Sequence, residues 1–404
     1  MSWKARDVVS QRIEFVVRAV KGEVGVSQLC REYGISRETG HLWLKRYREA
    51  GSFTALQDRS RAAHRIWNRT DSRIEDQVLA LRKEQGWAGR KIEWVLKRDL
   101  GIEVSARTVD RILNRRGCID NRDRNRSALT RFERGEPNEL WQMDFKGQYP
   151  LGGRDYCLPL TMLDDHSRYV VGLFALTGTG MEDVRTSLIT TFKRTGVPDE
   201  MLMDHGCPWW NTGNERGLTQ LSVMLMKQGV RLSYSGVGHP QTQGKVERFH
   251  RTLAESLKCK GIPKVFADWQ PRLDQIRHEY NDVRPHESLE MQVPSQRYRC
   301  GLRAYTDKPS EWKYPEELTP VELNSQGSLD YRRRRYFISR ALAKETVALQ
   351  QVDSKLLVRF RHMYVREVDL ITAETRSLIV EAEDRPMQTD AGVEKQKTVF
   401  PPPA

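Results

Sequence analysis

The first 117 residues carry a helical pattern of apolar positions. Five apolar residues near the start recur at spacings that suit one face of a helix; they are Val8, Ile13, Val16, Val17 and Val20. Residues 71–85, DSRIEDQVLALRKEQ, predict another helix. The N-terminal region is therefore expected to be all-α.

Two segments of this region have the form of a helix-turn-helix. In the first, we expect a helix over 27–33, a turn at Gly34 and a second helix over 36–48 that begins with Ser36 as its N-cap. Its small core is expected from four apolar residues, Leu29, Ile35, Leu42 and Leu44.

The second segment repeats this form without close sequence similarity. It predicts a helix over 90–99, a turn at Gly101 and a helix over 105–116 capped by Ser105. A short helix-turn-helix can equally be a plain packing unit. Two of them, followed by an arginine-rich segment, favour DNA binding.

The second helix of a helix-turn-helix enters the DNA major groove, so its polar side chains are the candidate DNA contacts. In the first unit these are Arg37, Thr39, His41, Lys45 and Arg46; in the second they are Arg107, Arg111 and Arg115.

From Leu140 the period of the apolar residues changes to that of strands. Residues 140–150, 154–166 and 167–176 predict three strands, the latter two antiparallel around a turn at 164–167. Helices and strands then alternate: we expect helices in 182–196, 217–229 and 244–258, and strands in 199–204 and 230–235. Strands followed by such alternation predict an α/β layer fold.

After about residue 315, short β-rich runs predict a small β-barrel with Arg332, Arg333, Arg334 and Arg335 at its edge. We favour a phosphate-binding role for these four arginines over a merely solvated run. The expected domains are a helix-turn-helix domain (1–60), a second one that resembles a winged helix (61–117), a basic linker (118–136), an α/β core (137–300), the barrel (301–375) and a disordered tail (376–404).

Composition narrows the class of partner. The chain of 404 residues has 67 Lys and Arg against 54 Asp and Glu, a net charge of +13, which favours a polyanion such as nucleic acid. The six cysteines lie far apart without a C-x-x-C pair, so neither a disulfide scaffold nor a cysteine zinc site is expected. No apolar run suits a membrane span or a secretory signal, so we expect a cytoplasmic protein without a membrane partner.

Three carboxylates are candidates for catalysis. Asp144 lies in the first expected strand, Asp204 ends the strand over 199–204, and Glu247 lies in the helix over 244–258. Converging carboxylates repel each other, and hard divalent cations such as Mg²⁺ relieve that repulsion. Most acidic residues of any chain are merely solvated, so these three carboxylates alone do not establish a catalytic site.

The surrounding motifs do carry a resemblance. Five motifs together resemble the integrase core of DDE transposases and retroviral integrases. In chain order they are WQMDF, LDDHSRYVVG, MLMDHG, GVGHPQTQGKVERFHRTL and YNDVRPHESL. The helix-turn-helix units resemble those of bacterial insertion-sequence transposases in that group. The resemblance covers roughly residues 10–370 and is strongest over 138–300.

The resemblance implies a ribonuclease-H-like core with Asp144, Asp204 and Glu247 as the metal-binding triad. It further implies two Mg²⁺ ions, for which Mn²⁺ could substitute, DNA nicking that frees a 3′-OH, and attack of that 3′-OH on target DNA, without a nucleotide cofactor. The N-terminal domains would bind the terminal inverted repeats, as a homo-oligomer on double-stranded DNA. Gln241, Gln243 and Lys245 resemble the family's DNA-contacting segment, and Arg248 and Arg251 follow on the same helix.

Two departures from the family pattern stand out. The interval between Asp204 and Glu247 is longer than usual, and the surplus is expected in a surface loop, CPWWNTGNERGL, over 207–218. The His/Cys zinc domain of retroviral integrases is replaced by the helix-turn-helix units, which favours a bacterial transposase.

Several other residues near the candidate carboxylates are more simply explained by structural roles. We expect Asp164, Asp165 and His166 to form a structural turn, Asp155 to be a hairpin residue, and the pair Trp209 and Trp210 to anchor its own loop. His205 and His239 flank the proposed site, where each is more simply a packed residue than a phosphate contact. Two rival functions remain: a non-catalytic DNA-binding regulator, and a ribonuclease-H-like nuclease that never joins DNA.

Overall fold

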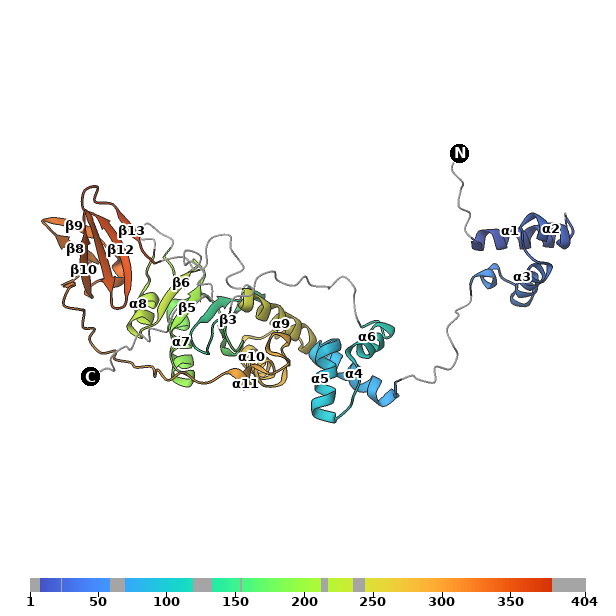
Figure 1. Cartoon of the computed structure of the whole chain (residues 1–404), viewed down its shortest axis with the longest axis horizontal. Helices are drawn as coiled ribbons and strands as arrows, with labels where there is room; N and C mark the ends of the chain where they lie inside the picture. The colour runs from blue at the N-terminus through green and yellow to red at the C-terminus, as the bar shows by residue number, and fades with distance from the viewer. Residues whose placement is uncertain are drawn as a thin grey trace, which may run out of the picture. The chain divides into compact units, whose positions relative to one another are not determined.

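The computed structural model describes residues 8–22, 24–58, 70–118, 133–152, 155–211, 217–234 and 244–379. These belong to two units, Met1–Asp71 and Ser72–Ala404, which are described separately (Figure 1). The expectations for most of the basic linker, for Gln241, Gln243 and His239, and for the tail beyond residue 379 lie outside the described residues. No helix in the described ranges has the length and apolar character needed to cross a membrane.

The first unit consists of α1 (Val8–Lys21), α2 (Val26–Glu32), α3 (Arg37–Ala50) and a short 3₁₀ turn, η1 (Phe53–Leu56). The predicted N-cap is confirmed: the Ser36 hydroxyl accepts a hydrogen bond from the backbone N–H of Thr39. The core is built from Phe15, Val16, Leu29, Cys30, Leu44 and Leu56. Leu42 does not belong to it, since its side chain is 46% exposed on the outer face of α3.

The second helical segment opens the larger unit with α4 (Ser72–Gln85), α5 (Gly89–Leu100) and α6 (Ala106–Arg115). Ser105 caps α6 as predicted, by accepting a hydrogen bond from the Thr108 N–H. Gly101 ends α5 in the left-handed conformation, with φ of +64°, where a residue without a Cβ is favoured. The core of this domain includes Val78, Trp87, Ile92, Leu96, Val109 and Leu113.

A mixed sheet forms the centre of the larger unit. Its strands are β1 (Trp141–Phe145), β2 (Tyr149–Pro150), β3 (Tyr156–Asp164), β4 (Val170–Leu176), β5 (Glu200–Met203) and β6 (Arg231–Tyr234). The order is β2-β3-β1-β5-β6, and β4 pairs with β3. The pairs β1–β3 and β3–β4 are antiparallel, while β1–β5 and β5–β6 are parallel, as expected where helices connect the strands.

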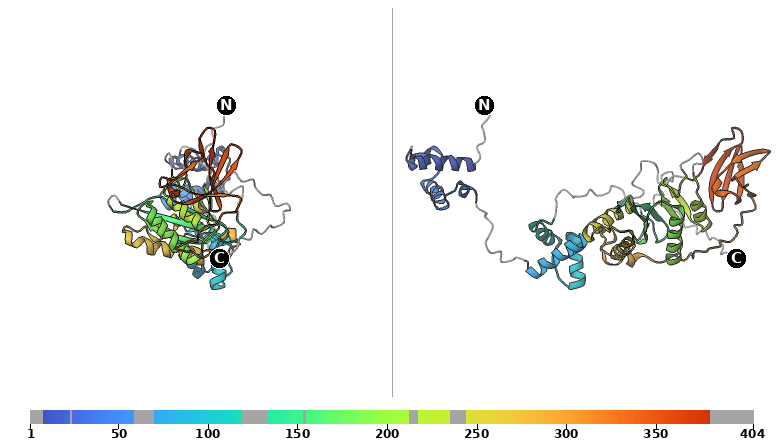
Figure 2. Two further views of the ribbon diagram at one scale, coloured as in Figure 1. Left: turned by 90° about the vertical axis from the view of Figure 1, so that its left-hand side faces the viewer. Right: turned by 180° about the vertical axis from the view of Figure 1, so that it is seen from behind.

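Helices cover both faces of this sheet (Figures 1 and 2). Alternate residues of β1 explain the two layers: Trp141 and Met143 face the apolar cluster shared with α7 (Met181–Thr195) and α8 (Gln220–Lys227). The opposite face packs against α9 (Gly244–Lys260) and α10 (Trp269–His278). A π-helical turn (Glu279–Val283), a 3₁₀ turn (Glu287–Leu289) and α11 (Pro294–Arg297) then lead out of the core.

The C-terminal strands form open sheets, so the prediction of a β-barrel is wrong. They are β7 (Thr319–Glu322), β8 (Ser328–Tyr331), β9 (Arg334–Phe337), β10 (Thr346–Val352), β11 (Lys355–Phe360), β12 (Met363–Asp369) and β13 (Thr375–Ser377). Five of them have the order β13-β12-β11-β10-β7, while β8 and β9 pair only with each other. A barrel requires its edge strands to pair, and within the described residues β7 and β13 do not. Because β13 reaches Ser377 and Ile379 is buried, the ordered domain also extends beyond the predicted boundary at 375.

Candidate active site

The register of two parallel strands brings Asp144 and Asp204 to the same end of the sheet. Trp141 of β1 pairs with Met201 of β5, and Gln142 pairs with Leu202. Two residues further along, the same register places Asp144 beside Asp204, the first residue after β5. Side chains at the carboxyl ends of parallel strands commonly form ligand sites in α/β folds.

The loop after β5 is built around the carboxylate of Asp204. Its Oδ1 accepts hydrogen bonds from the backbone N–H of Gly206, at 3.0 Å, and from the indole N–H of Trp209. The Trp209 side chain is 1% exposed and stacks on Phe145 of β1, with ring centroids 5.2 Å apart. The segment 207–218 is therefore only partly a surface loop, and the anchoring role predicted for Trp209 is confirmed.

Asp144 lies in a half-buried position with negative neighbours. Its side chain is 23% exposed, and its Oδ2 is 3.6 Å from Nδ1 of His250. Burial is the main cause that raises the pKa of Asp144 to about 6, and the negative charges of Asp204 and Glu247 raise it further. The charges of the other two predicted carboxylates thus both act on Asp144.

His250 is a buried partner of Asp144 on α9. Its Nε2 lies 3.0 Å from the hydroxyl of Thr161, which is the cross-strand neighbour of Asp144 on β3. Burial lowers the pKa of His250 to about 3, so the ring is neutral near pH 7. His250 therefore adjoins Asp144 without adding a positive charge.

Glu247 lies on the exposed side of the first turn of α9. Within the described ranges, no three Asp, Glu, His or Cys side chains are grouped closely enough to hold a metal ion. The donor set nonetheless fits a hard divalent cation, because it consists of carboxylate oxygens and because burial, together with the charges of Asp204 and Glu247, raises the pKa of Asp144.

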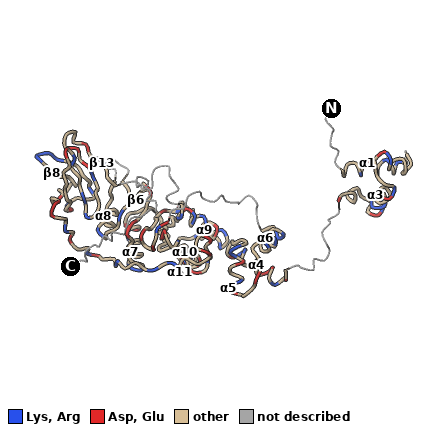
Figure 3. The backbone as a smooth tube through the Cα atoms, viewed as in Figure 1, with Lys and Arg blue, Asp and Glu red and all other residues tan. Residues whose placement is uncertain are grey.

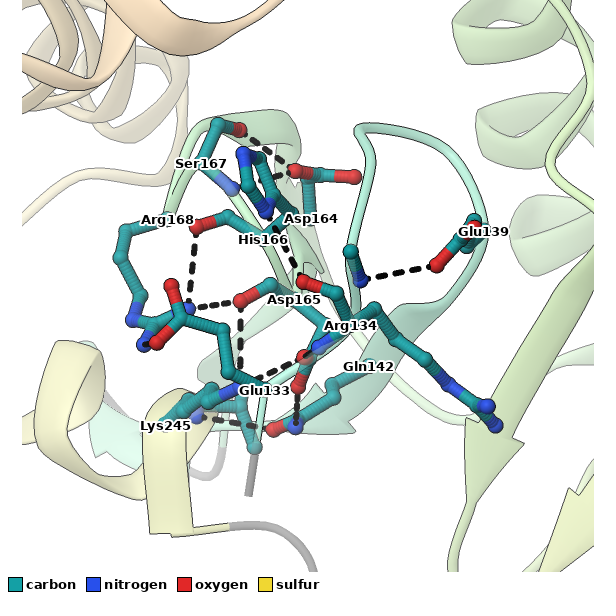
Figure 4. Close-up of polar contacts among 12 residues, drawn as sticks. Glu133, Arg134, Glu139, Gln142, Asp164, Asp165, His166, Ser167, Arg168 and Lys245 are labelled. Atoms are coloured by element: carbon teal, nitrogen blue, oxygen red, sulfur yellow. Dashed lines mark hydrogen bonds and ion pairs between the residues drawn. The ribbon is translucent and has the colours of Figure 1, made fainter. Parts of the chain in front are cut away.

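The turn between β3 and β4 is structural, as expected, but it also reaches α9 (Figure 4). Asp164 accepts hydrogen bonds from the N–H and the hydroxyl of Ser167 and thereby closes the turn. Asp165 is fully buried and forms an ion pair with Lys245, whose Nζ lies 2.5 Å from its Oδ2. The Lys245 side chain is only 15% exposed and its ammonium is engaged by Asp165, which does not fit the expected DNA contact. Arg248 and Arg251 are exposed on α9.

The candidate DNA contacts of the two helix-turn-helix segments differ in their exposure and in the contacts that they make within the protein. Arg37, His41 and Lys45 are exposed on α3, while Thr39 shares the N-cap of that helix and the guanidinium of Arg46 lies over the ring of Trp43. On α6, Arg107 and Arg111 are exposed. Arg115 is exposed as well, at 44%, but its guanidinium is engaged, with Nη2 2.6 Å from the buried carboxylate of Glu75.

The four consecutive arginines lie on the β8–β9 hairpin (Figure 3). Arg332 and Arg333 form its turn, with φ of 47° and 64°, and both are exposed. Arg335 pairs with Asp330 across the hairpin, at 2.8 Å. Arg334 also lies on the exposed surface of β9.

Sequence reasoning missed the residues that support the carboxylates. No sequence motif indicated that Trp209 would bond to Asp204, or that Gln142 and Thr161 would contact side chains and backbone around the site. His250 could have been found, since it follows Glu247 by three residues and so shares its side of the helix.

Models of known protein families match both the core and the N-terminal helical segments. Two models described as integrase core domain match residues 134–240 and 228–294. A helix-turn-helix domain model matches residues 11–64, and a homeodomain-like domain model matches residues 39–113.

Individual proteins give a similar result. The chain is 25% identical over 252 residues to the "Insertion element IS407 uncharacterized 31.7 kDa protein" of Burkholderia multivorans, a match that covers 59% of this chain and 87% of that protein. It is 24% identical over 280 residues to the "Transposase for transposon Tn552" of Staphylococcus aureus, with 62% of this chain and 56% of that protein covered.

Two solved structures also match part of the chain. The HTLV-2 integrase catalytic core domain in complex with magnesium covers 40% of this chain and 97% of its own, at 15% identity and a TM-score of 0.31. A simian T-cell lymphotropic virus intasome in complex with a PP2A regulatory subunit covers 70% of this chain and 91% of its own, at 12% identity and a TM-score of 0.37. By its family matches, the chain carries an integrase core domain behind helix-turn-helix domains, and it is similar to an insertion-element protein and to a transposon transposase.

Proposed function

We propose that this protein is a DDE transposase that cleaves the ends of an insertion sequence and joins the resulting 3′-OH to target DNA. The observation that carries the proposal is the juxtaposition of Asp144 and Asp204 at the ends of β1 and β5, on the side of the sheet that α9 covers. Glu247 is the third carboxylate of this region, since it lies in the first turn of α9, the helix that covers this side of the sheet.

Asp144, Asp204 and Glu247 would hold the divalent ions. When bound, two Mg²⁺ or Mn²⁺ ions supply activation of the attacking oxygen and stabilisation of the leaving oxygen in phosphodiester exchange. The chain's own residues prepare the site: Trp209 and the Gly206 N–H orient the Asp204 carboxylate, and the neutral His250 adjoins Asp144 without competing as a cation.

DNA recognition is divided among the domains in this proposal. The exposed arginines of α3 and α6 read the terminal inverted repeats, since both belong to helix-turn-helix segments. Arg248 and Arg251 lie on the helix of Glu247 and would bind phosphates beside the reacting bond. The β8–β9 hairpin, with Arg332 and Arg333 at its turn, would add contacts that do not depend on sequence. Because two ends must be joined together, we expect a dimer or a larger assembly on DNA.

The test is a DNA-joining assay. Purified full-length protein is mixed with a labelled, pre-cut element end and a supercoiled plasmid in Mg²⁺, with parallel reactions in Mn²⁺ and in EDTA. Asp204→Asn removes one charge of the proposed triad. Asp155→Asn is the matched control, because Asp155 is exposed in the β2–β3 hairpin away from the carboxylate site.

We expect metal-dependent joined product from the unmodified protein and from Asp155→Asn, and none from Asp204→Asn, with end binding retained by all three. Cleavage without joining would identify a nuclease instead. End binding without either reaction, in both metals, would identify a DNA-binding regulator.

A further inference from the structure

A buried polar network connects the first turn of α9 to the middle of β1 and to the β3–β4 turn (Figure 4). We propose that Gln142, Asp165 and Lys245 are positioning residues that fix the start of α9, and with it Glu247, against the strand that carries Asp144. The inference rests on the proposed function in one respect, namely that Glu247 is a catalytic residue.

Asp165 is the centre of the network. Its side chain is fully buried, and its two oxygens face three donors from three different segments. Oδ1 accepts a hydrogen bond from Nε2 of Gln142 at 2.9 Å, and Oδ2 accepts one from the backbone N–H of Arg134 at 2.8 Å. The ammonium of Lys245 completes the set, 2.5 Å from Oδ2 and 3.1 Å from the Asp165 carbonyl oxygen.

Gln142 makes the second connection to α9. Its Oε1 accepts a hydrogen bond from the backbone N–H of Val246, at 3.2 Å. The first N–H groups of a helix have no partner within the helix, so a buried side-chain acceptor fixes where the helix begins. Glu247 is the next residue, and its backbone position is therefore set by Gln142 on one side of the turn and by the Lys245–Asp165 pair on the other.

A third contact sets the register of the helix along the strand. Asp144 follows Gln142 by two residues on β1, which is about 6.6 Å of strand. His250 follows Val246 by four residues on α9, which is about 6 Å of helix. The Asp144–His250 contact, at 3.6 Å, is therefore a second contact between β1 and α9, at matching distances along the strand and the helix from the Gln142–Val246 contact. Glu247 lies between these two points.

The segment that enters the core from the linker takes part as well. Besides the Arg134 N–H, the Arg134 carbonyl oxygen lies 2.9 Å from Nδ1 of His166. Arg168, in the same turn, pairs with Glu133 at 3.3 Å. The end of the basic linker is thus bonded to the same turn that holds Lys245.

A buried ion pair is weak evidence of a stabilising role, because desolvating two charges costs about as much as their attraction returns. Fixing one register among several is the better attested use of such a pair. The location supports that use here, since Gln142 precedes Asp144 by two residues and Lys245 precedes Glu247 by two.

The test compares Lys245→Met and Gln142→Met with Lys258→Met, which removes an exposed lysine further along the same helix. Lys245→Arg is the conservative variant expected to restore function in part. The double variant Asp165→Asn/Lys245→Met removes both charges together, so it avoids an unpaired buried charge if Lys245→Met does not fold. Hydrogen exchange is measured on peptides covering residues 244–250 and on the rest of the core, together with end binding and DNA joining.

We expect exchange in the first turn of α9 to rise about 10-fold in Lys245→Met, Gln142→Met and the double variant, with the remaining core changed less than about 2-fold. Joining should fall about 10- to 100-fold, the range typical of residues that orient a metal ligand, while end binding stays unchanged. Lys258→Met should match the unmodified protein in all three measurements.

Unchanged exchange at residues 244–250 would overturn the inference. A uniform rise of exchange through the whole core would overturn it as well, because that result indicates only a loss of overall stability. If the unmodified protein does not join DNA, the proposed function fails, whereas the exchange data still decide whether the network positions α9.

Discussion

At the scale of single residues, Trp209 shows how an apolar side chain can serve a polar site. Its ring packs flat on Phe145 and is almost fully buried, while its indole N–H donates to Asp204. A carboxylate held by a rigid donor keeps one orientation, and holding a ligand in place before a metal binds lowers the cost of forming the site.

We therefore predict that Trp209→Phe keeps the packing but loses the hydrogen bond, so that joining falls about 10-fold or more while end binding is unchanged. Trp210→Phe is the matched control, because the Trp210 ring contacts His205 and Tyr234 and no described hydrogen bond joins its indole to Asp204. Rates of joined product from pre-cut ends measure both. Equal rates for the two variants would exclude the orienting role of Trp209.

His362 provides a pH-dependent residue away from the catalytic site. Its Nε2 lies 3.2 Å from the Val230 carbonyl oxygen, and its Nδ1 is buried without a hydrogen-bond partner among the described residues. Burial is the main cause that lowers the pKa of His362 to about 4. A proton added to the folded protein would place a donor where no acceptor is available.

The unfolded chain binds that proton near pH 6.5, whereas the folded chain binds it only near pH 4. Stability is thus unaffected above pH 6.5 and declines as pH falls from 6.5 towards 4. Between pH 7 and 5.5, His362 should cost about 1 kcal/mol of unfolding free energy. His362→Gln keeps a donor for Val230 and should remove that part of the loss in urea unfolding. An unchanged pH dependence would contradict this.

At the scale of elements, local signals predicted most boundaries correctly. The N-caps Ser36 and Ser105 mark the starts of α3 and α6 because a hydroxyl satisfies a free N–H wherever a helix begins. The α10 helix was not predicted, because its apolar residues Trp269, Leu273 and Ile276 form only a short stripe among charges. The open C-terminal sheet could not be told from a barrel, since closure depends on which edges pair and no local pattern encodes that.

The candidate site was predictable in part. Asp144, Asp204 and Glu247 could be chosen because they end strands or begin a helix within recognisable motifs. The Asp165–Lys245 pair could not, since it joins residues 80 positions apart in sequence and each residue had a simpler local interpretation. The sequence around Lys245 resembles a DNA-contacting segment, and only the fold shows that its ammonium is paired with Asp165.

The α6 helix allows the DNA-binding proposal to be tested against a structural role. Both Arg111 and Arg115 are exposed, but Arg115 also pairs with the buried Glu75. Arg111→Ala should weaken binding to the element end, reduce its salt slope by about 1 and leave stability unchanged. Arg115→Ala should instead lower the unfolding midpoint of the domain, because Glu75 loses a close partner. Binding titrations at several salt concentrations, with thermal unfolding, separate the two effects. The assignment fails if Arg111→Ala binds as tightly as the unmodified protein.

At the scale of the whole molecule, the C-terminal sheet and the α/β core of the larger unit share one apolar cluster. Residues of β6 and α8, such as Leu232 and Met226, pack in the same cluster as Val358 and Phe360 of β11. Polar contacts reinforce the junction: Arg361 donates to the Lys227 carbonyl oxygen at 2.9 Å, and Lys227 pairs with Glu345.

We predict that the core and the C-terminal sheet unfold together. Arg361→Ala should destabilise both by about 1–3 kcal/mol, because the half-buried Lys227 carbonyl loses a charged donor. Arg332→Ala, at the exposed hairpin turn, should leave the stability of the core and of the C-terminal sheet unchanged. Hydrogen exchange followed through urea unfolding reports each part separately. Two well-separated transitions would show that the shared cluster does not couple them.

The central claim is that Asp144, Asp204 and Glu247 form one catalytic site, and the joining rates of single and double variants test it most directly. Asp144→Asn, Asp204→Asn and Glu247→Gln should each lower the joining rate by about 1,000-fold or more. The rate of the double variant Asp204→Asn/Glu247→Gln should lie within about 10-fold of either single variant, because the effects of residues that act as a unit are not additive. Normal joining by Glu247→Gln, or losses that multiply in the double variant, would contradict the account.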